Sequence, residues 1–183
     1  MTTEVIILAQ GTQKRMGPGA IYKQLLPLPA CGNVSILVRT IRQLDLYDRA
    51  QRDLGSHVHI TLLTWRDLYQ AMEGLPELDE LDEDMIQLPN PGNSSLKGIA
   101  RYLELRGPRH RYDATIVLLG DVVYSWKCLD ALWAMSITAG FVGTANVSGD
   151  AGEIWGVAWA REHEETMLTD LRDALLRHPP YED

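Results

Sequence analysis

Short apolar runs separated by polar and glycine-containing segments recur along the chain and predict buried strands. The first run extends from Val5 to Ala9 and passes directly into a polar loop that contains glycine. A continuous apolar run with turn residues at its end is typical of a strand buried on both faces. Further strands are predicted over residues 57–64, 85–88, 114–119, 141–147 and 154–159, which are rich in β-branched and apolar residues.

Apolar residues at helical spacing lie between these runs. They predict helices after Asn33, after Ser94 or Ser95, over 129–133 and over 162–177, where a Pro-Pro pair follows. The first of these helices would present one apolar face made of Val34, Leu37, Val38, Ile41 and Leu44. Because strands alternate with helices, the pattern predicts an α/β fold, a three-layer α/β/α sandwich around a mostly parallel sheet.

Length and composition limit the class of protein. A chain of 183 residues is long enough for one well-formed core and short for two, which predicts a single domain over residues 1–183. The apolar fraction of 45% and the charged fraction of 23% are ordinary for a globular protein. The formal net charge of −8 argues against binding to nucleic acid or to anionic membranes, because phosphate surfaces attract basic faces. A nucleotide site is compatible with this charge, since it needs only a few local cations.

The cysteines and the N-terminal segment indicate the compartment. Cys31 and Cys128 are the only cysteines, and a pair without CxxC spacing is typical of a reduced cytosolic protein. Residues 1–4 carry no basic side chain, and the apolar run after them is too short for a signal peptide or a membrane span. The sequence therefore predicts a cytoplasmic protein.

The loop after the first strand combines glycine with positive charge, since it contains Gly11, Lys14, Arg15 and Gly17. A buried strand that ends in such a loop brings backbone N–H groups and cations to a phosphate, which favours a nucleotide site. The spacing is not that of a Walker loop, because Pro18 stands where its lysine belongs, and no GxGxxG fingerprint is present. The alternative is a plain strand-to-helix turn with incidental cations.

Two linked segments carry a family resemblance. Leu8-Ala9-Gln10-Gly11 with Arg15-Met16-Gly17, followed by Lys23-Gln24-Leu25-Leu26-Pro27-Leu28, resembles the N-terminal motif of nucleotidyltransferases with a GT-A-like, Rossmann-like fold. Members of that family join a nucleoside triphosphate to a phosphorylated small molecule. Three positions depart from the motif: its second glycine falls on Gln13, its small hydroxyl residue on Lys14 and its proline on Tyr22. Gln13 cannot adopt the backbone of glycine freely, which indicates a reshaped loop.

A second match follows the predicted strand 114–119. The residues Gly120-Asp121-Val122-Val123 are similar to the family's G-D-x-P, whose aspartate holds the catalytic magnesium, with Val123 in place of the proline. A carboxylate at the carboxyl end of a buried parallel strand faces the crevice where ligands bind. Mg²⁺ takes one or two carboxylates together with phosphate and water oxygens. Asp121 is therefore the predicted metal ligand, and the alternative is that Asp121 caps the helix that follows.

A third match and a second metal ligand rest on fewer residues. The segment Ser95-Leu96-Lys97-Gly98-Ile99 is similar to the loop with which the family reads base and ribose, although a capped helix explains most of it. Residues 152–157 resemble the strand that lines the family's acceptor site, and Glu153 is the second candidate metal ligand. The acidic run 77–84 favours a solvated segment over a metal site.

The resemblance implies a Mg²⁺-dependent reaction in which a nucleoside monophosphate group passes from a triphosphate to a phosphorylated acceptor, with release of pyrophosphate. Arg15 and Lys23 are the implied catalytic residues: Arg15 acts on the leaving pyrophosphate, and Lys23 acts on the α-phosphate as charge develops. The residues expected to bind the nucleotide are Leu8, Ala9, Gly11, Thr12, Arg15, Lys23, Ser95 and Gly98.

The acceptor and the activity leave alternatives open. A sugar 1-phosphate is favoured by the block from Lys23 to Leu28, while the short chain is nearer in size to relatives that modify the molybdenum cofactor or an alcohol phosphate. The expected partners are the triphosphate and the acceptor, with no nucleic acid and no membrane, and a homodimer is left open. Because Gln13, Tyr22 and Val123 depart from the motifs, a non-catalytic nucleotide-binding or assembly protein on the same fold is the alternative function.

Overall fold

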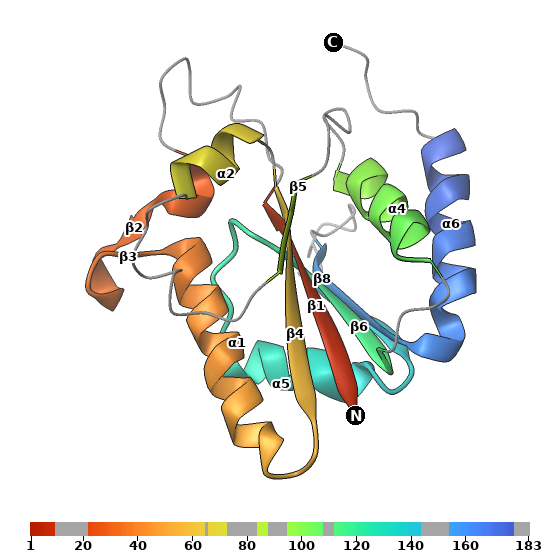
Figure 1. The fold of residues 1–183 in the computed structure, drawn as a ribbon, viewed down its shortest axis with the longest axis horizontal. Coiled ribbons are helices and arrows are strands. Elements are labelled where there is room, and N and C mark those ends of the chain that lie inside the picture. The colour runs from red at the N-terminus through yellow and green to blue at the C-terminus, as the bar shows by residue number, and fades with distance from the viewer. Residues whose placement is uncertain are drawn as a thin grey trace, which may run out of the picture.

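A six-stranded sheet forms the centre of the molecule, with the strand order β5-β4-β1-β6-β8-β7 (Figure 1). The computed structural model describes residues 1–9, 22–64, 66–72, 84–87, 95–107, 112–143 and 154–177. The strands of this sheet are β1 (Thr2–Ala9), β4 (His57–Thr64), β5 (Asp84–Gln87), β6 (Ala114–Leu119), β7 (Ala139–Gly143) and β8 (Ile154–Ala160). Neighbouring strands are parallel from β5 to β6, and β8 runs antiparallel to β6 and to β7. The predicted mostly parallel sheet is confirmed.

Helices cover both faces of the sheet and complete three layers. One face carries α1 (Ile36–Arg52), α2 (Arg66–Met72) and α5 (Trp126–Met135), and the other carries α4 (Ser95–Arg106) and α6 (Glu164–Arg177) (Figure 1). A small hairpin of β2 (Pro27–Leu28) and β3 (Val34–Ser35) precedes α1. Within the described residues, three-residue 3₁₀ helices are formed by Lys23–Leu25, Pro29–Cys31 and Arg161–His163. Among the described helices, none combines the length and the apolar character that crossing a membrane requires.

The start of the first helix differs from the prediction. Asn33 is not its N-cap, because Asn33 lies in a tight turn with a φ of 63° and the next two residues form β3. The helix begins at Ile36, and the Ser35 hydroxyl accepts the hydrogen bond of the Val38 N–H at 3.3 Å. The sequence pattern misplaced the start because Val34, which matches the helical spacing, pairs with Leu28 in the hairpin.

The predicted strands also differ in their bounds, by one residue at the start of β5 and at the end of β8, and by more in β1 and β7. β1 begins at Thr2 rather than Val5, since its polar first residues pair in parallel with β4 from His57 onward. A prediction from apolar runs leaves these polar residues outside the strand. β7 spans Ala139–Gly143 rather than 141–147, and residues 144–147 lie outside the described part of the chain.

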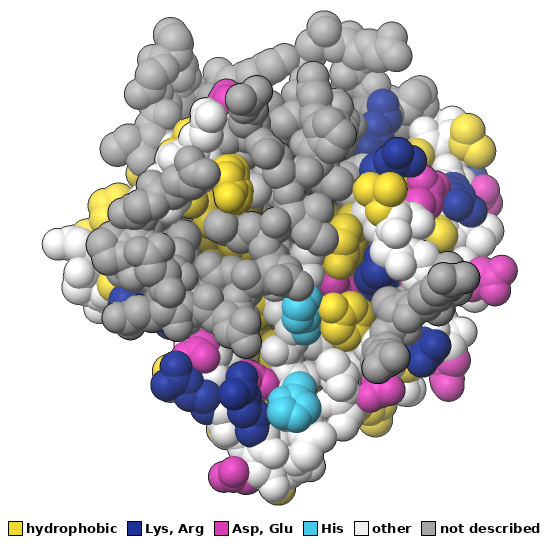
Figure 2. All heavy atoms as spheres, viewed as in Figure 1, with side chains coloured by type: hydrophobic (Ala, Val, Ile, Leu, Met, Phe, Trp, Pro, Cys, Tyr) yellow, Lys and Arg dark blue, Asp and Glu magenta, His cyan; other side chains and the backbone are white. Residues whose placement is uncertain are grey.

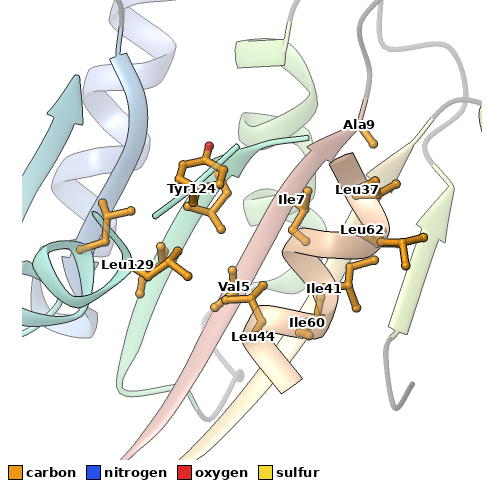
Figure 3. Packing of buried hydrophobic residues seen from close by; sticks show 14 of the residues in the cluster. Val5, Ile7, Ala9, Leu37, Ile41, Leu44, Ile60, Leu62, Tyr124 and Leu129 are labelled. Atoms are coloured by element: carbon orange, nitrogen blue, oxygen red, sulfur yellow. The ribbon is translucent and has the colours of Figure 1, made fainter. Parts of the chain in front are cut away.

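Alternating residues of the central strand supply the cores of both layers. Val5, Ile7 and Ala9 face α1 and α5 and lie among fully buried side chains such as Leu37 and Leu129 (Figure 3). The residues between them in β1, including Ile6 and Leu8, face α4 and α6. Both faces of β1 are therefore buried, which explains the uninterrupted apolar run from Val5 to Ala9.

A buried ionic cluster joins β1 to the helices α4 and α6 near the amino end of the sheet. Glu4 is fully buried and forms an ion pair with Arg106, which also pairs with Glu164. The Tyr102 and Thr61 hydroxyls donate hydrogen bonds to the same Glu4 carboxylate. The ion pair and the hydrogen bonds offset the cost of burying the Glu4 carboxylate.

Charged side chains of both signs are interspersed on the described surface over α4 and α6. Figure 2 shows this on the right half of the view, where neither sign dominates a large area among the coloured side chains. The coloured side chains on this part of the view therefore form no continuous basic face.

Candidate functional site

The parallel strands end together at one edge of the sheet. Ala9 pairs with Thr64, Thr64 pairs with Gln87, and Leu8 pairs with Leu119. From β1 the chain moves outward to β4 and β5 on one side, and then returns to β6 on the other side. The gap between the carboxyl ends of β1 and β6 is therefore the topological switch point, where open α/β sheets bind their ligands.

Gly120 joins the two strands that flank this switch point. Its backbone N–H donates a hydrogen bond to the Leu8 carbonyl at 2.9 Å. A Cβ atom at position 120 would lie 3.0 Å from the Leu8 oxygen and 3.3 Å from the Ala9 Cα, so the close approach favours glycine. Asp121 consequently leaves the sheet beside the end of β1, where the predicted phosphate loop begins.

Asp121 is exposed and takes part in no ion pair within the described residues. It does not cap α5, because the Ser125 hydroxyl fills that role by accepting from the Cys128 N–H at 3.2 Å. The alternative explanation of Asp121 as a helix cap is therefore wrong. The exposed carboxylate of Asp121 is of the type that Mg²⁺ takes as a ligand, with its remaining ligands from phosphate and water. The described residues contain no cluster of three or more His, Cys, Asp or Glu that could hold a metal ion.

Tyr124 fixes the segment that follows Asp121. Its hydroxyl accepts the Leu119 N–H at 2.8 Å and donates to the Trp155 carbonyl at 2.6 Å. The ring is 1% exposed and lies among the buried apolar side chains, with the hydroxyl pointing away from Leu129 (Figure 3). Burial, and less strongly the nearby Cys128 and Asp121, raise the pKa of Tyr124 above its usual range. The hydroxyl therefore stays protonated and able to donate.

Arg39 ties the same segment to helix α1. Its Nη1 atom donates to the Tyr124 carbonyl at 3.0 Å and to the Gln43 Oε1 atom at 2.7 Å. Arg39 lies in the first turn of α1, so the N-terminus of that helix is held at the same edge of the sheet. Sequence reasoning missed Tyr124 and Arg39, because both bonds join residues far apart in the chain and no local motif marks them.

The predicted nucleotide-binding residues in β1 are accessible only through their backbone. Leu8 is 6% exposed and Ala9 is fully buried, with both side chains in the core. Lys23 is exposed in the 3₁₀ helix Lys23–Leu25, where its neighbours Gln24 and Leu25 are buried or packed against the core. The ammonium group is thus carried on an anchored segment.

Tyr22, which replaces the family's proline, precedes that 3₁₀ helix and packs against the apolar core. Partial burial, and less strongly the charge of Asp67, raise the pKa of Tyr22 above its usual value. Tyr22 therefore contributes to packing at this position.

The remaining predicted residues lie at or beyond the limits of the description. α4 begins at Ser95 and its N-terminal end is directed toward the edge where the parallel strands finish, with Gly98 buried in its first turns (Figure 1). Gly11, Thr12, Arg15 and Glu153 lie outside the described residues. Because β8 is antiparallel to β6, it starts at the edge where β6 ends, and Glu153 is the residue before that start.

Comparisons with known proteins identify the fold. No family model matches the sequence, and no curated protein does. The structure of a homologue of Mycobacterium tuberculosis Rv0371c from Mycobacterium sp. strain JC1 matches with a TM-score of 0.54 and 17% identity, over 96% of this chain and 78% of that one. The inositol-1-phosphate CTP transferase of T. maritima matches with a TM-score of 0.53 and 12% identity, over 95% and 81% of the two chains.

A third solved structure is the 4-diphosphocytidyl-2C-methyl-D-erythritol synthase of Anaerococcus prevotii. It matches with a TM-score of 0.52 and 13% identity, over 99% of this chain and 80% of that one. The chain therefore has the GT-A-like nucleotidyltransferase fold, as its motifs predict.

Proposed function

We propose that this chain transfers a nucleoside monophosphate group from a nucleoside triphosphate to a phosphorylated small molecule, with release of pyrophosphate and dependence on Mg²⁺. The observation that carries this proposal is the bond from the Gly120 N–H to the Leu8 carbonyl at 2.9 Å. It sets the exposed carboxylate of Asp121 beside the end of β1, at the switch point of a sheet with the nucleotidyltransferase fold. Two structures that share the fold are named for cytidylyl transfer, which supports the reaction class.

In the proposed reaction an oxygen of the acceptor phosphate attacks the α-phosphorus of the triphosphate. The bond from the α-phosphorus to the bridging oxygen breaks, and pyrophosphate leaves with the electron pair. Asp121 would hold the divalent metal, which when bound neutralises charge on the phosphates. No covalent intermediate with the protein is needed, so the side chains serve to position and neutralise.

The cations of the first loop and of the following 3₁₀ helix have different proposed roles. Lys23 donates to the α-phosphate, where charge builds up during attack, and Arg15 holds the leaving pyrophosphate. The amide of Gly11 and the hydroxyl of Thr12 complete the phosphate site, and Ser95 and Gly98 contact the nucleoside. Glu153 is proposed as the second metal ligand, since it precedes the strand that starts at this edge.

A sugar 1-phosphate is the acceptor that the motif from Lys23 to Leu28 favours. The name of the T. maritima structure adds inositol 1-phosphate as a candidate acceptor. Substrate screening with both compounds distinguishes a sugar 1-phosphate from inositol 1-phosphate as the acceptor.

The experiment is a pyrophosphate-release assay with ATP, GTP, CTP, UTP and dTTP against sugar 1-phosphates, inositol 1-phosphate and an alcohol phosphate. Release that requires both an acceptor and Mg²⁺, and that stops with a chelator, is the expected result. Metal-dependent binding of a triphosphate without release for any acceptor would favour the non-catalytic alternative. Absence of both binding and release would overturn the proposal.

A further inference from the structure

The pairing of β6 with β8 stops at Leu118, two residues before Gly120. The last pair of the ladder is Leu118 with Gly156, and the next antiparallel pair would join Leu119 to Trp155. In its place the Tyr124 hydroxyl lies between the two strands, accepting from the Leu119 N–H and donating to the Trp155 carbonyl. One phenol oxygen thus replaces a direct backbone hydrogen bond and separates the strands at this point.

A β-bulge in β8 occurs at the same place. Val142 of β7 pairs with Gly156 and Gly143 pairs with Ile154, which leaves Trp155 as the extra residue of β8. A bulge re-aims the backbone locally and is frequent beside active sites. Here it leaves the Trp155 carbonyl bonded to the phenol of Tyr124.

Helix α1 holds the backbone of Tyr124 through Arg39. Its carbonyl accepts from Arg39, whose guanidinium is itself oriented by Gln43. The segment from Gly120 to Tyr124 is therefore fastened at its first residue to β1, and at its last residue to β6, β8 and α1. Asp121 is exposed between these two fixed points.

We infer that Tyr124 is the positioning residue for Asp121: its hydroxyl holds β6 and β8 apart and fixes the path of the segment that carries the carboxylate. This inference rests on the proposed function, because it concerns the residue proposed to hold the metal. Tyr124 does not touch the substrate itself, since its side chain is almost fully buried, and it acts through the backbone of residues 119–121. Partners that orient a metal ligand typically change metal affinity or activity by about 10- to 100-fold when they are removed.

The chain offers a matched control for the loss of a buried phenol hydroxyl. Tyr102 is 6% exposed, and its hydroxyl bonds to Glu4 on the opposite face of the sheet. Tyr102→Phe and Tyr124→Phe both delete one oxygen from a packed ring, so each variant is expected to unfold at a lower temperature than the parent. Only Tyr124→Phe removes a bond next to Asp121.

The test measures the affinity of the parent and both variants for ATP, GTP, CTP, UTP and dTTP, by calorimetry in Mn²⁺ and again in a chelator. Tyr124→Phe is expected to weaken the Mn²⁺-dependent affinity by about tenfold or more, while the chelator value stays near that of the parent. Tyr102→Phe is expected to keep both values of the parent. Arg39→Gln is the second variant, in case Tyr124→Phe does not fold, and it is expected to act in the same direction.

Three results would overturn the inference. Equal affinities in the two phenylalanine variants would show that Tyr124 is only structural, while the proposed function stands. A Tyr124→Phe variant that loses affinity equally with and without the metal would remove the link to Asp121. A parent that binds none of the five triphosphates in Mn²⁺ would overturn the proposed function, and this inference with it.

Discussion

Gly120 donates its backbone N–H to the Leu8 carbonyl at 2.9 Å, and this bond joins the ends of the two strands that flank the switch point. The strands lie so close that a Cβ atom at position 120 would contact backbone atoms of Leu8 and Ala9 at less than an ordinary van der Waals distance. The relationship fixes where Asp121 leaves the sheet relative to the loop that follows Ala9.

Gly120→Ala is expected to lower the free energy of unfolding by about 1–3 kcal/mol, because the added Cβ would press on backbone atoms of Leu8 and Ala9. It should also reduce transfer activity, since any relief of the contact moves Asp121. Urea denaturation and the transfer assay measure the two effects. Gly140→Ala is the control, because its Cβ would meet the flexible side chain of Met135 and should cost less. Equal stability of Gly120→Ala and the parent would contradict the role of the close approach.

Asp121→Asn is expected to leave the thermal unfolding temperature unchanged, because the side chain is exposed and forms no ion pair within the described residues. The rate of nucleotidyl transfer should fall by a factor on the order of 100, since a neutral amide holds a divalent metal poorly. Asp130→Asn changes the same type of exposed side chain on α5 and should keep the activity of the parent. Full activity of Asp121→Asn would remove Asp121 from the metal site.

Lys23→Ala is expected to lower kcat by a factor on the order of 100, with a smaller change in KM, because its cation is proposed to act as charge develops at the α-phosphate. Arg15→Ala should instead weaken triphosphate binding. Arg49→Ala removes a surface cation that pairs with Asp45, and it should change neither constant. Steady-state kinetics separate these outcomes, and two variants that bind and turn over like the parent would show that these cations do not contact phosphate.

Most of the fold could be predicted from the sequence, because the patterns that mark its strands and helices lie within short segments of the chain. Continuous apolar runs such as Val5–Ala9 identify strands buried on both faces, and alternation with helices implies parallel pairing. The predicted starts of β1 and of α1 were wrong because they depend on pairing with residues elsewhere in the chain. Thr2 and Thr3 belong to β1 because both pair with β4 and Thr3 also pairs with Ala114 of β6. Val34 is not helical because Leu28 pairs with it.

The candidate site could be predicted only in part, for the same reason. Asp121 and the glycine before it form a short motif, so the sequence located them. The hydroxyl of Tyr124 and the guanidinium of Arg39 act across 31 and 85 residues of chain, respectively, and no spacing rule links such positions. The roles assigned to all of the site residues stay predictions, and Gly11, Thr12, Arg15 and Glu153 also lie outside the described structure.

Arg106→Met is expected to destabilise the protein by about 3–5 kcal/mol, because it leaves the fully buried Glu4 without its countercharge. Adding Glu4→Gln to this variant should recover part of the loss, since no unpaired buried charge then remains. Arg49→Met breaks an exposed ion pair with Asp45 and should cost less than about 1 kcal/mol. Denaturant titrations of the four proteins check this order, and a loss in Arg106→Met no larger than in Arg49→Met would show that the cluster is not needed for stability.

A metal–nucleotide complex is proposed to bind between the carboxyl ends of β1 and β6. Paramagnetic broadening by Mn²⁺ tests this directly, because substoichiometric Mn²⁺ added with a nucleoside triphosphate broadens the backbone amide signals nearest to the bound ion. Broadening that begins at Ala9, Gly120, Asp121 and Val122, and that is lost in Asp121→Asn, is the predicted result. Broadening centred on the acidic run 77–84 or on the first turn of α6, and unchanged in Asp121→Asn, would contradict the claim.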